Sequence, residues 1–214
     1  GLQVHSIKDP SWAGRTVRWR NMRILTDDLE ANRTARDPEV TELNFLQNQL
    51  TDYEIRQGWR LLWDGKTSAG WRGAKLDHFP AEGWTMKDGI LTVESTDGGE
   101  STVPGDIVTT DSFGNFELMF EFRISEGANS GIKYYVNTET NKGPGSSIGL
   151  EYQILDDKEH PDALKGNHEG SRTISSLYDL IQANPDKPIN PIGEWSSARI
   201  VSKNNHVEHW LNGM

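Results

Sequence analysis

The sequence has no cysteine among its 214 residues. A chain without cysteine forms no disulfide, binds no metal through thiolates and has no cysteine nucleophile, and its redox compartment stays open. No run of 18 apolar residues occurs, so the sequence predicts no membrane-spanning helix. The chain also lacks the P-loop, dinucleotide, H-E-x-x-H and EF-hand motifs, so none of these short motifs assigns a reaction.

Basic residues are also fewer than acidic ones. The 22 Lys and Arg residues stand against 32 Asp and Glu residues, which gives a net charge of −10 and a pI of about 5.1. This balance argues against a nucleic-acid partner, which would require a basic face. Neutral ligands and cations remain open, and eight Trp residues in an acidic, Gly-rich chain are typical of proteins that handle sugars.

What the sequence does contain, from Trp59 onward, is a series of short β-type segments separated by Gly, Asn, Asp and Pro. In residues 116–125, FELMFEFRIS, apolar side chains alternate with polar ones. That alternation predicts a strand with one face buried. Many such strands without intervening helices predict an all-β fold, a β-sandwich or jelly roll.

The first 57 residues differ from the rest. Residues 1–24 predict two strands, with Val17, Trp19 and Asn21 on one face of the second. Residues 25–57 predict a helical linker, because Asp37-Pro38 is a helix start and apolar residues follow at helical spacing. Residues 51–54 form a capping box that predicts a second short helix. The third segment is then residues 58–214.

Two stretches carry side chains suited to a site. In residues 126–136, EGANSGIKYYV, a sharp turn presents Asn129 and Ser130 before a strand that carries Lys133. In residues 149–163, GLEYQILDDKEHPDA, Glu151 and Gln153 share one face of a strand. An ordinary turn and strand explain the first stretch equally well.

The second stretch runs on into a loop with five ionisable groups. Asp156 and Asp157 could ligate Ca²⁺ or a similar divalent cation through oxygen atoms, although no metal-spacing signature is present. His160 beside a carboxylate could instead act as a general base. A solvated acidic loop without chemistry is the third interpretation.

Further candidates lie toward the C-terminus. Tyr178 and Trp195 are expected at strand edges, where a ligand could reach them, although such residues are more often packing residues. His209 lies in the predicted strand HVEHW, where a single histidine usually has a structural role. From the residues alone, sugar binding and sugar hydrolysis cannot be separated.

Several blocks taken together carry a resemblance. They are GWRLLWDGKTSAGWRG, GDIVTTDSFGNFELMFEFRISEGANSGIKYYV, GLEYQILDDKEHPDA, SLYDLI, GEWSSARIV and HVEHWLNG, in that order. Over roughly residues 50–214 the chain resembles the 3-keto-disaccharide hydrolase domain family. The resemblance implies a concanavalin-like jelly roll, a carbohydrate substrate and export by a bacterium to the periplasm or cell surface.

The resemblance also bears on the order of the segments. Domains of this family continue past the WLNG hairpin and end with strands similar to GxLxLQxH and VxFRNIxI. Here such strands stand at the other end, as GLQVHSI and VRWRNMRI within residues 1–24. They are expected either to belong to a preceding copy in a tandem, permuted or trimmed protein, or to complete this domain. Strand complementation by a second copy or a second chain is a related expectation, since an unpaired sheet edge is avoided.

The chemistry that the resemblance implies is cleavage of a 3-keto-glycoside, in which a base removes the acidified C2 proton. His160 or His209 is the expected base. Glu151, Asp156 and Gln153 are expected as ligands or acid–base partners, and Arg123 or Lys133 near the enolate. Asn129, Ser130 and Tyr178 are expected to hold hydroxyl groups, and Trp195 to contact the sugar. Two alternatives remain, a non-catalytic glycan-binding module and a structural spacer.

Overall fold

The computed structural model describes residues 1–3, 14–32, 46–94, 105–140 and 145–214. Strands dominate the described residues, which confirms the all-β prediction, and the helices are short. The elements in chain order are β1 (Val17–Leu25), α1 (Leu29–Asn32), α2 (Asp52–Arg56), β2 (Arg60–Leu61), β3 (Trp71–Gly73), β4 (Trp84–Lys87), β5 (Ile90–Val93), β6 (Ile107–Thr109), β7 (Phe116–Ile124), β8 (Asn129–Asn137), β9 (Ile148–Leu155), the 3₁₀ helix η2 (Pro161–Leu164), β10 (Ser196–Lys203) and β11 (His206–Leu211). None of the helices in these ranges has the length and hydropathy to cross a bilayer.

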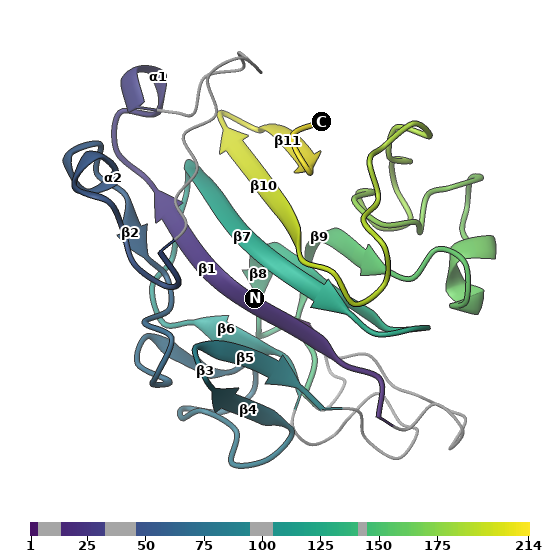
Figure 1. The fold of residues 1–214 in the computed structure, drawn as a ribbon, viewed down its shortest axis with the longest axis horizontal. Coiled ribbons are helices and arrows are strands. Elements are labelled where there is room, and N and C mark those ends of the chain that lie inside the picture. The colour runs from purple at the N-terminus through teal and green to yellow at the C-terminus, as the bar shows by residue number, and fades with distance from the viewer. Residues whose placement is uncertain (4–13, 33–45, 95–104, 141–144) are drawn as a thin grey trace.

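The strands form two layers (Figure 1). The first sheet has the order β11-β10-β7-β1-β5-β4, with β2 paired to β1. The second layer consists of the pairs β3–β6 and β8–β9, which lie behind the first sheet in Figure 1. Leu2 joins the two pairs, because it bridges antiparallel to both Ile107 of β6 and Ile132 of β8.

The N-terminal segments therefore take part in both layers. Residues 1–3 lie between β6 and β8 in the second layer, and β1 lies between β5 and β7 in the first sheet. Strand β1 thus pairs with strands 76 and 107 residues further on, as the registers Val17↔Val93 and Val17↔Ile124 show.

The core lies between the layers and is lined by alternate residues of each strand. On β7 the buried face is Leu118, Phe120, Phe122 and Ile124, as the alternation in FELMFEFRIS predicts. From the second layer, Ile132 and Tyr134 of β8 face them, together with alternate residues of β9. Burial of these apolar and aromatic surfaces stabilises the sandwich.

Strand β1 corrects one sequence prediction. Simple alternation places Asn21 with Trp19 and puts Met22 on the opposite face, but Met22 is 1% exposed and packs in the core with Trp19. The cause is a β-bulge: the register to β7 shifts between Arg20 and Arg23, and Asn21 has a φ of 53°. A bulge inserts one residue and reverses the facing of those that follow.

Other local predictions have mixed outcomes. The capping box is present, since Glu54 N–H donates to Thr51 Oγ1 and Thr51 N–H donates to Glu54 Oε2. Tyr178 was expected at a strand edge, but residues 175–181 form turns with isolated bridges at Leu177 and Ile181. The helix start predicted at Asp37-Pro38 lies outside the described residues.

Candidate functional site

Four polar residues share the outward face of the β8–β9 pair. Because side chains alternate along a strand, Ile132 and Tyr134 face the core, and the residues between them face outward. Lys133 lies directly opposite Glu151, and Gly131 lies opposite Gln153. We call this surface the β8–β9 outer face, and its members are Asn129, Lys133, Glu151 and Gln153.

The charges on this face have little contact with solvent. Lys133 is 8% exposed, Glu151 6% and Gln153 0%. Lys133 Nζ donates to Asp106 Oδ2 at 2.9 Å and to the Ser147 carbonyl at 3.0 Å. The same Asp106 oxygen accepts from the Ser147 N–H at 3.1 Å. The ammonium group is therefore fixed in place by a buried carboxylate that is itself hydrogen-bonded.

Glu151 extends across the strand pair, above Gly131. A Cβ atom built on Gly131 would lie 2.3 Å from Glu151 Oε1, which is far inside contact distance. Only glycine leaves room for the carboxylate at this position. Next along the face, Gln153 Nε2 donates to Asn129 Oδ1 at 3.1 Å. The face thus places one carboxylate beside an amide pair and a lysine.

Tyr178 lies at the rim of this face. Its N–H donates to the Glu151 carbonyl at 3.0 Å, and its hydroxyl donates to Asp162 Oδ2 at 2.9 Å. Burial, assisted by the Asp162 hydrogen bond and by nearby negative charge that includes Glu151, raises the pKa of the Tyr178 hydroxyl above its ordinary value. The hydroxyl is therefore protonated throughout the neutral range and can act as a hydrogen-bond donor.

Arg172 holds this rim together. Its guanidinium contacts Asp162 Oδ1 at 2.9 Å and Asp179 Oδ2 at 2.8 Å, and its charge lies 5.0 Å from the centre of the Tyr178 ring. The hydrogen bond from Arg172 lowers the pKa of the Asp179 carboxyl. Two carboxylates and one aromatic ring thus share a single guanidinium, which fixes the position of Tyr178.

His160 lies in the loop after β9 and caps η2. Its Nδ1 accepts from the Asp162 N–H at 3.2 Å, so in this arrangement a neutral ring carries its proton on Nε2. His160 lies near the rim because it contacts Asp162, which also accepts the hydrogen bond from Tyr178. It is not part of the β8–β9 outer face.

His209 lies inside the sandwich. Its ring contacts the rings of Tyr134 and Tyr152, which face the core, at 5.8 Å and 4.8 Å between centroids. Nδ1 contacts the Ser175 carbonyl at 3.1 Å, and Nε2 contacts the Tyr134 hydroxyl at 3.0 Å. Burial lowers the pKa of His209 to about 4, so the ring is neutral at pH 7. Both nitrogens have protein partners on the side of β8 opposite to Lys133.

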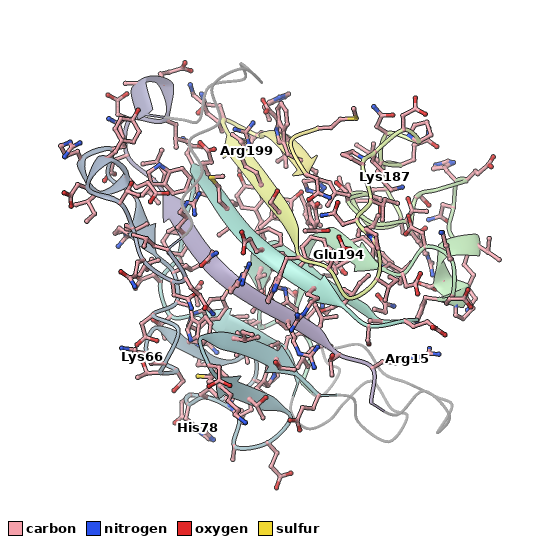
Figure 2. All side chains as sticks on the ribbon, in the orientation of Figure 1. Arg15, Lys66, His78, Lys187, Glu194 and Arg199 are labelled. Carbon is pink, nitrogen blue, oxygen red and sulfur yellow. The ribbon has the colours of Figure 1, made fainter. Side chains whose placement is uncertain are left out.

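Arg123 and Trp195 lie on the outward face of the first sheet, on the far side of the sandwich. The guanidinium carbons of Arg20 and Arg123 lie 4.1 Å and 4.8 Å from the centroid of the Trp195 ring. Burial, together with the charges of Arg18 and Arg20, lowers the pKa of Arg123. Figure 2 shows Glu194, which precedes Trp195, in front of β7 and β10. The structure therefore separates Arg123 and Trp195 from Glu151.

The two aspartates proposed as metal ligands already have protein partners. Asp156 accepts from the N–H groups of Gly127 and Lys158, at 2.7 Å and 3.0 Å. Asp157 accepts from the Ile174 N–H at 2.7 Å and pairs with Lys187 at 3.3 Å, and burial raises its pKa. Within the described ranges, no group of three or more His, Asp or Glu residues is arranged to hold a metal.

Ser130 also departs from the expected grouping. It is fully buried, and its hydroxyl donates to the Gln3 carbonyl. The structure thus groups Asn129, Lys133, Glu151 and Gln153, with Tyr178 at the rim. Sequence reasoning missed Asp106 as the partner of Lys133, because no local pattern connects residues 27 positions apart. It also missed Arg172, which contacts Asp162, Asp179 and the Tyr178 ring.

Comparison with known proteins gives concordant matches. A family model described as the 3-keto-alpha-glucoside-1,2-lyase-like domain matches residues 58–214. The chain is 38% identical over 165 residues to a 3-keto-disaccharide hydrolase of Bacteroides thetaiotaomicron. That alignment covers 72% of this chain but 56% of the relative, so the chain spans little more than half of that protein.

Solved structures of similar fold carry related descriptions. A putative glycosyl hydrolase from Parabacteroides distasonis superposes with a TM-score of 0.63 at 32% identity, covering 78% of this chain and 74% of that one. A second putative glycosyl hydrolase from the same organism has a TM-score of 0.50 at 27% identity, covering 67% and 68%. These matches agree with the β-sandwich described above.

Proposed function

The chain belongs to the 3-keto-alpha-glucoside-1,2-lyase-like family, and we propose that it cleaves the glycosidic bond of 3-keto-glycosides with Glu151 as the base. The relative from B. thetaiotaomicron, named a 3-keto-disaccharide hydrolase, supports the substrate class. Because residues 58–214 carry the family match, the proposal concerns the site on β8 and β9. Export to the periplasm or cell surface is part of the same proposal.

The reaction follows from the carbonyl at C3. A base removes the C2 proton, and the electron pair forms an enolate with the negative charge on O3. The enolate then expels the C1 oxygen, which takes a proton, and leaves a C1=C2 bond conjugated to the ketone. Water adds to C1 while C2 regains a proton, so the net reaction is hydrolysis. The protein must supply a base, a positive charge or hydrogen-bond donor near O3 and a proton donor for the leaving group.

The β8–β9 outer face offers these groups. Glu151 would act as the base, and Lys133, directly opposite on β8, would stabilise the enolate oxygen. The amides of Asn129 and Gln153 would hold sugar hydroxyl groups, and the protonated Tyr178 would donate from the rim in place of its hydrogen bond to Asp162. Low exposure favours the chemistry, since electrostatic stabilisation is stronger where water is excluded.

One observation carries the proposal. The Glu151 carboxylate crosses from β9 to lie over Gly131 of β8, where any Cβ would be 2.3 Å from Oε1, two residues along the strand from Lys133. Glycine at this position keeps open the place that the carboxylate occupies on the outer face. Positioned general bases contribute about 10²–10⁴-fold to rate.

The test measures turnover of a 3-keto-glucoside through the release of product. The unoxidised glucoside is the substrate control. We expect Glu151→Gln to lower kcat at least about 100-fold, while Glu121→Gln on the other sheet leaves it within about twofold. Equal circular dichroism spectra would show that both variants fold. Unchanged turnover in Glu151→Gln would refute the assignment, and saturable sugar binding without product release would indicate a glycan-binding module instead.

A further inference from the structure

A row of polar side chains crosses the outward face of the first sheet. Arg18 of β1 pairs with Arg123 of β7 on one side and with Thr92 of β5 on the other. Thr92 in turn pairs with Thr85 of β4. Each of the four is at least partly exposed, and the residue before each one in its strand faces the core. Trp195, which directly precedes β10, packs beside Arg123 at the end of the row. We call these five residues the arginine row.

The centre of the row places two positive charges opposite each other. Directly paired residues of antiparallel strands have Cβ atoms about 4.5–5.5 Å apart, and like charges at such positions are destabilising. Within the described residues, neither Arg18 nor Arg123 forms an ion pair or a side-chain hydrogen bond, and the Nε–H of Arg123 is buried without an acceptor. Burial and the charges of Arg18 and Arg20 lower the pKa of Arg123. The described part of the chain thus supplies this pair with no counter-charge.

Two carboxylates near the row do not neutralise it. Glu121, two residues before Arg123, already binds the Arg20 guanidinium and the Asn21 amide. Glu194 is exposed and lies in front of β7 and β10 in Figure 2. In the ranges that the structure describes, Glu194 forms no ion pair. The row therefore keeps a local excess of positive charge on a chain whose net charge is −10.

We propose that the arginine row is a binding site for an anionic sugar, whose sulfate or carboxylate group lies between Arg18 and Arg123. Guanidinium groups bind such oxyanions through paired, charge-assisted hydrogen bonds. A bound oxyanion supplies the counter-charge that the two arginines lack. The repulsion between them is therefore relieved only in the complex, which is the reason for keeping two like charges opposite each other.

The rest of the row favours a sugar over a free ion. Thr92 and Thr85 continue the row beyond Arg18 with hydroxyl groups, which can donate to and accept from sugar hydroxyls. Neither hydroxyl has a hydrogen-bond partner within the described residues. With strands about 4.8 Å apart, the row from Thr85 to Arg123 extends about 14 Å, which exceeds the size of a single ion. The site is independent of the reaction proposed for Glu151, because the core separates the two faces.

The experiment is an NMR titration of the intact chain at low ionic strength, followed at the amide signals of Arg18, Thr92 and Arg123. The probes are glucose 6-sulfate, glucuronic acid, inorganic sulfate and neutral glucose. We expect both anionic sugars to bind at least about tenfold more tightly than glucose or inorganic sulfate, and added salt to weaken them. Arg18→Gln and Arg123→Gln should each weaken binding at least about tenfold.

Arg56→Gln is the matched control, since it makes the same change in net charge at an exposed arginine of α2, outside the sheet. Unchanged signals from the core strands show that each variant folds. Binding that is lost in Arg18→Gln and Arg123→Gln but kept in Arg56→Gln confirms the site, and the tighter anionic sugar identifies the oxyanion.

Three results would overturn the proposal. Equal weakening in all three variants shows attraction by net charge alone. Inorganic sulfate that binds as tightly as glucose 6-sulfate shows an adventitious ion only and removes the sugar as the ligand. Signals of Arg18 and Arg123 that do not shift with either anionic sugar show that the row binds neither.

Discussion

Two ion pairs, one on each outward face of the sandwich, differ in burial. On the β8–β9 outer face, Lys133 and its partner Asp106 are 8% and 2% exposed. On the first sheet, the ion pair of Arg20 and Glu121 has side chains 27% and 30% exposed. The first sheet also carries a buried pair, Arg199 with Glu117, whose side chains are 10% and 0% exposed. The comparison is therefore between a buried pair and a half-exposed one. Buried charges require fixed partners, and groups held in this way are suited to chemistry.

The largest effect is expected from breaking the buried pair. Lys133→Met leaves the Asp106 carboxylate buried without its counter-charge, which should lower the free energy of unfolding by about 3–5 kcal/mol. Arg20→Met removes a half-exposed partner and should cost at most about 1 kcal/mol. Urea denaturation measures both. The double variant Lys133→Met with Asp106→Asn should recover much of the loss, and a loss as large as that of the single variant would contradict an ion-pair origin.

The second prediction concerns the pH dependence of stability that His209 causes in the interior of the sandwich. Burial lowers the pKa of His209 in the folded protein to about 4, from its ordinary value of 6.5, so the unfolded chain binds the proton more readily. The stability that His209 contributes is complete above pH 6.5 and is lost as the pH falls toward 4, by up to about 3 kcal/mol. Urea denaturation between pH 7 and pH 4.5 measures it.

His209→Gln should flatten this pH dependence, whereas substitution of the exposed His206 should leave it intact. His209→Gln also shows whether His209 has a structural role or a catalytic one. Turnover per folded molecule should stay within about threefold, and a loss of 100-fold would restore His209 as the base.

The third prediction concerns the space above Gly131. Gly131→Ala places a Cβ where Glu151 Oε1 lies and must move the carboxylate, so we expect kcat to fall about 100-fold. Gly114→Ala is the matched control, since nothing lies within 4 Å of its Cβ position. Full activity in Gly131→Ala would mean that the carboxylate position is unimportant for turnover.

The smallest effect is expected on the opposite face. Trp195→Ala removes the ring that contacts Arg20 and Arg123, and should lower the free energy of unfolding by about 1–2 kcal/mol. Turnover of the 3-keto-glucoside should remain within about twofold, because this face is separated from Glu151 by the core. A selective rise in KM would place substrate on the first sheet and contradict the comparison.

Local patterns in the sequence predicted much of the architecture and part of the site. The alternation in β7 correctly predicted which residues are buried, and the strand parity of β9 placed Glu151 and Gln153 together. The bulge in β1 was not predicted, because it depends on the pairing with β7 and on the contacts of Asn21 with Asn48 and Glu121. The inward position of His209 was missed for a similar reason, since strand parity gives two faces but not which one is buried.

The all-β class, the acidic net charge, the absence of thiol chemistry and the residue types of the candidate site can all be read from the amino-acid sequence. These follow from composition and from a two-residue period, which are local properties. Only the tertiary structure decided that β1 lies between β5 and β7, that Lys133 meets Asp106, and that Glu151 and Arg123 lie on opposite sides. Each of these depends on the pairing and packing of strands far apart in the chain, which no local pattern specifies.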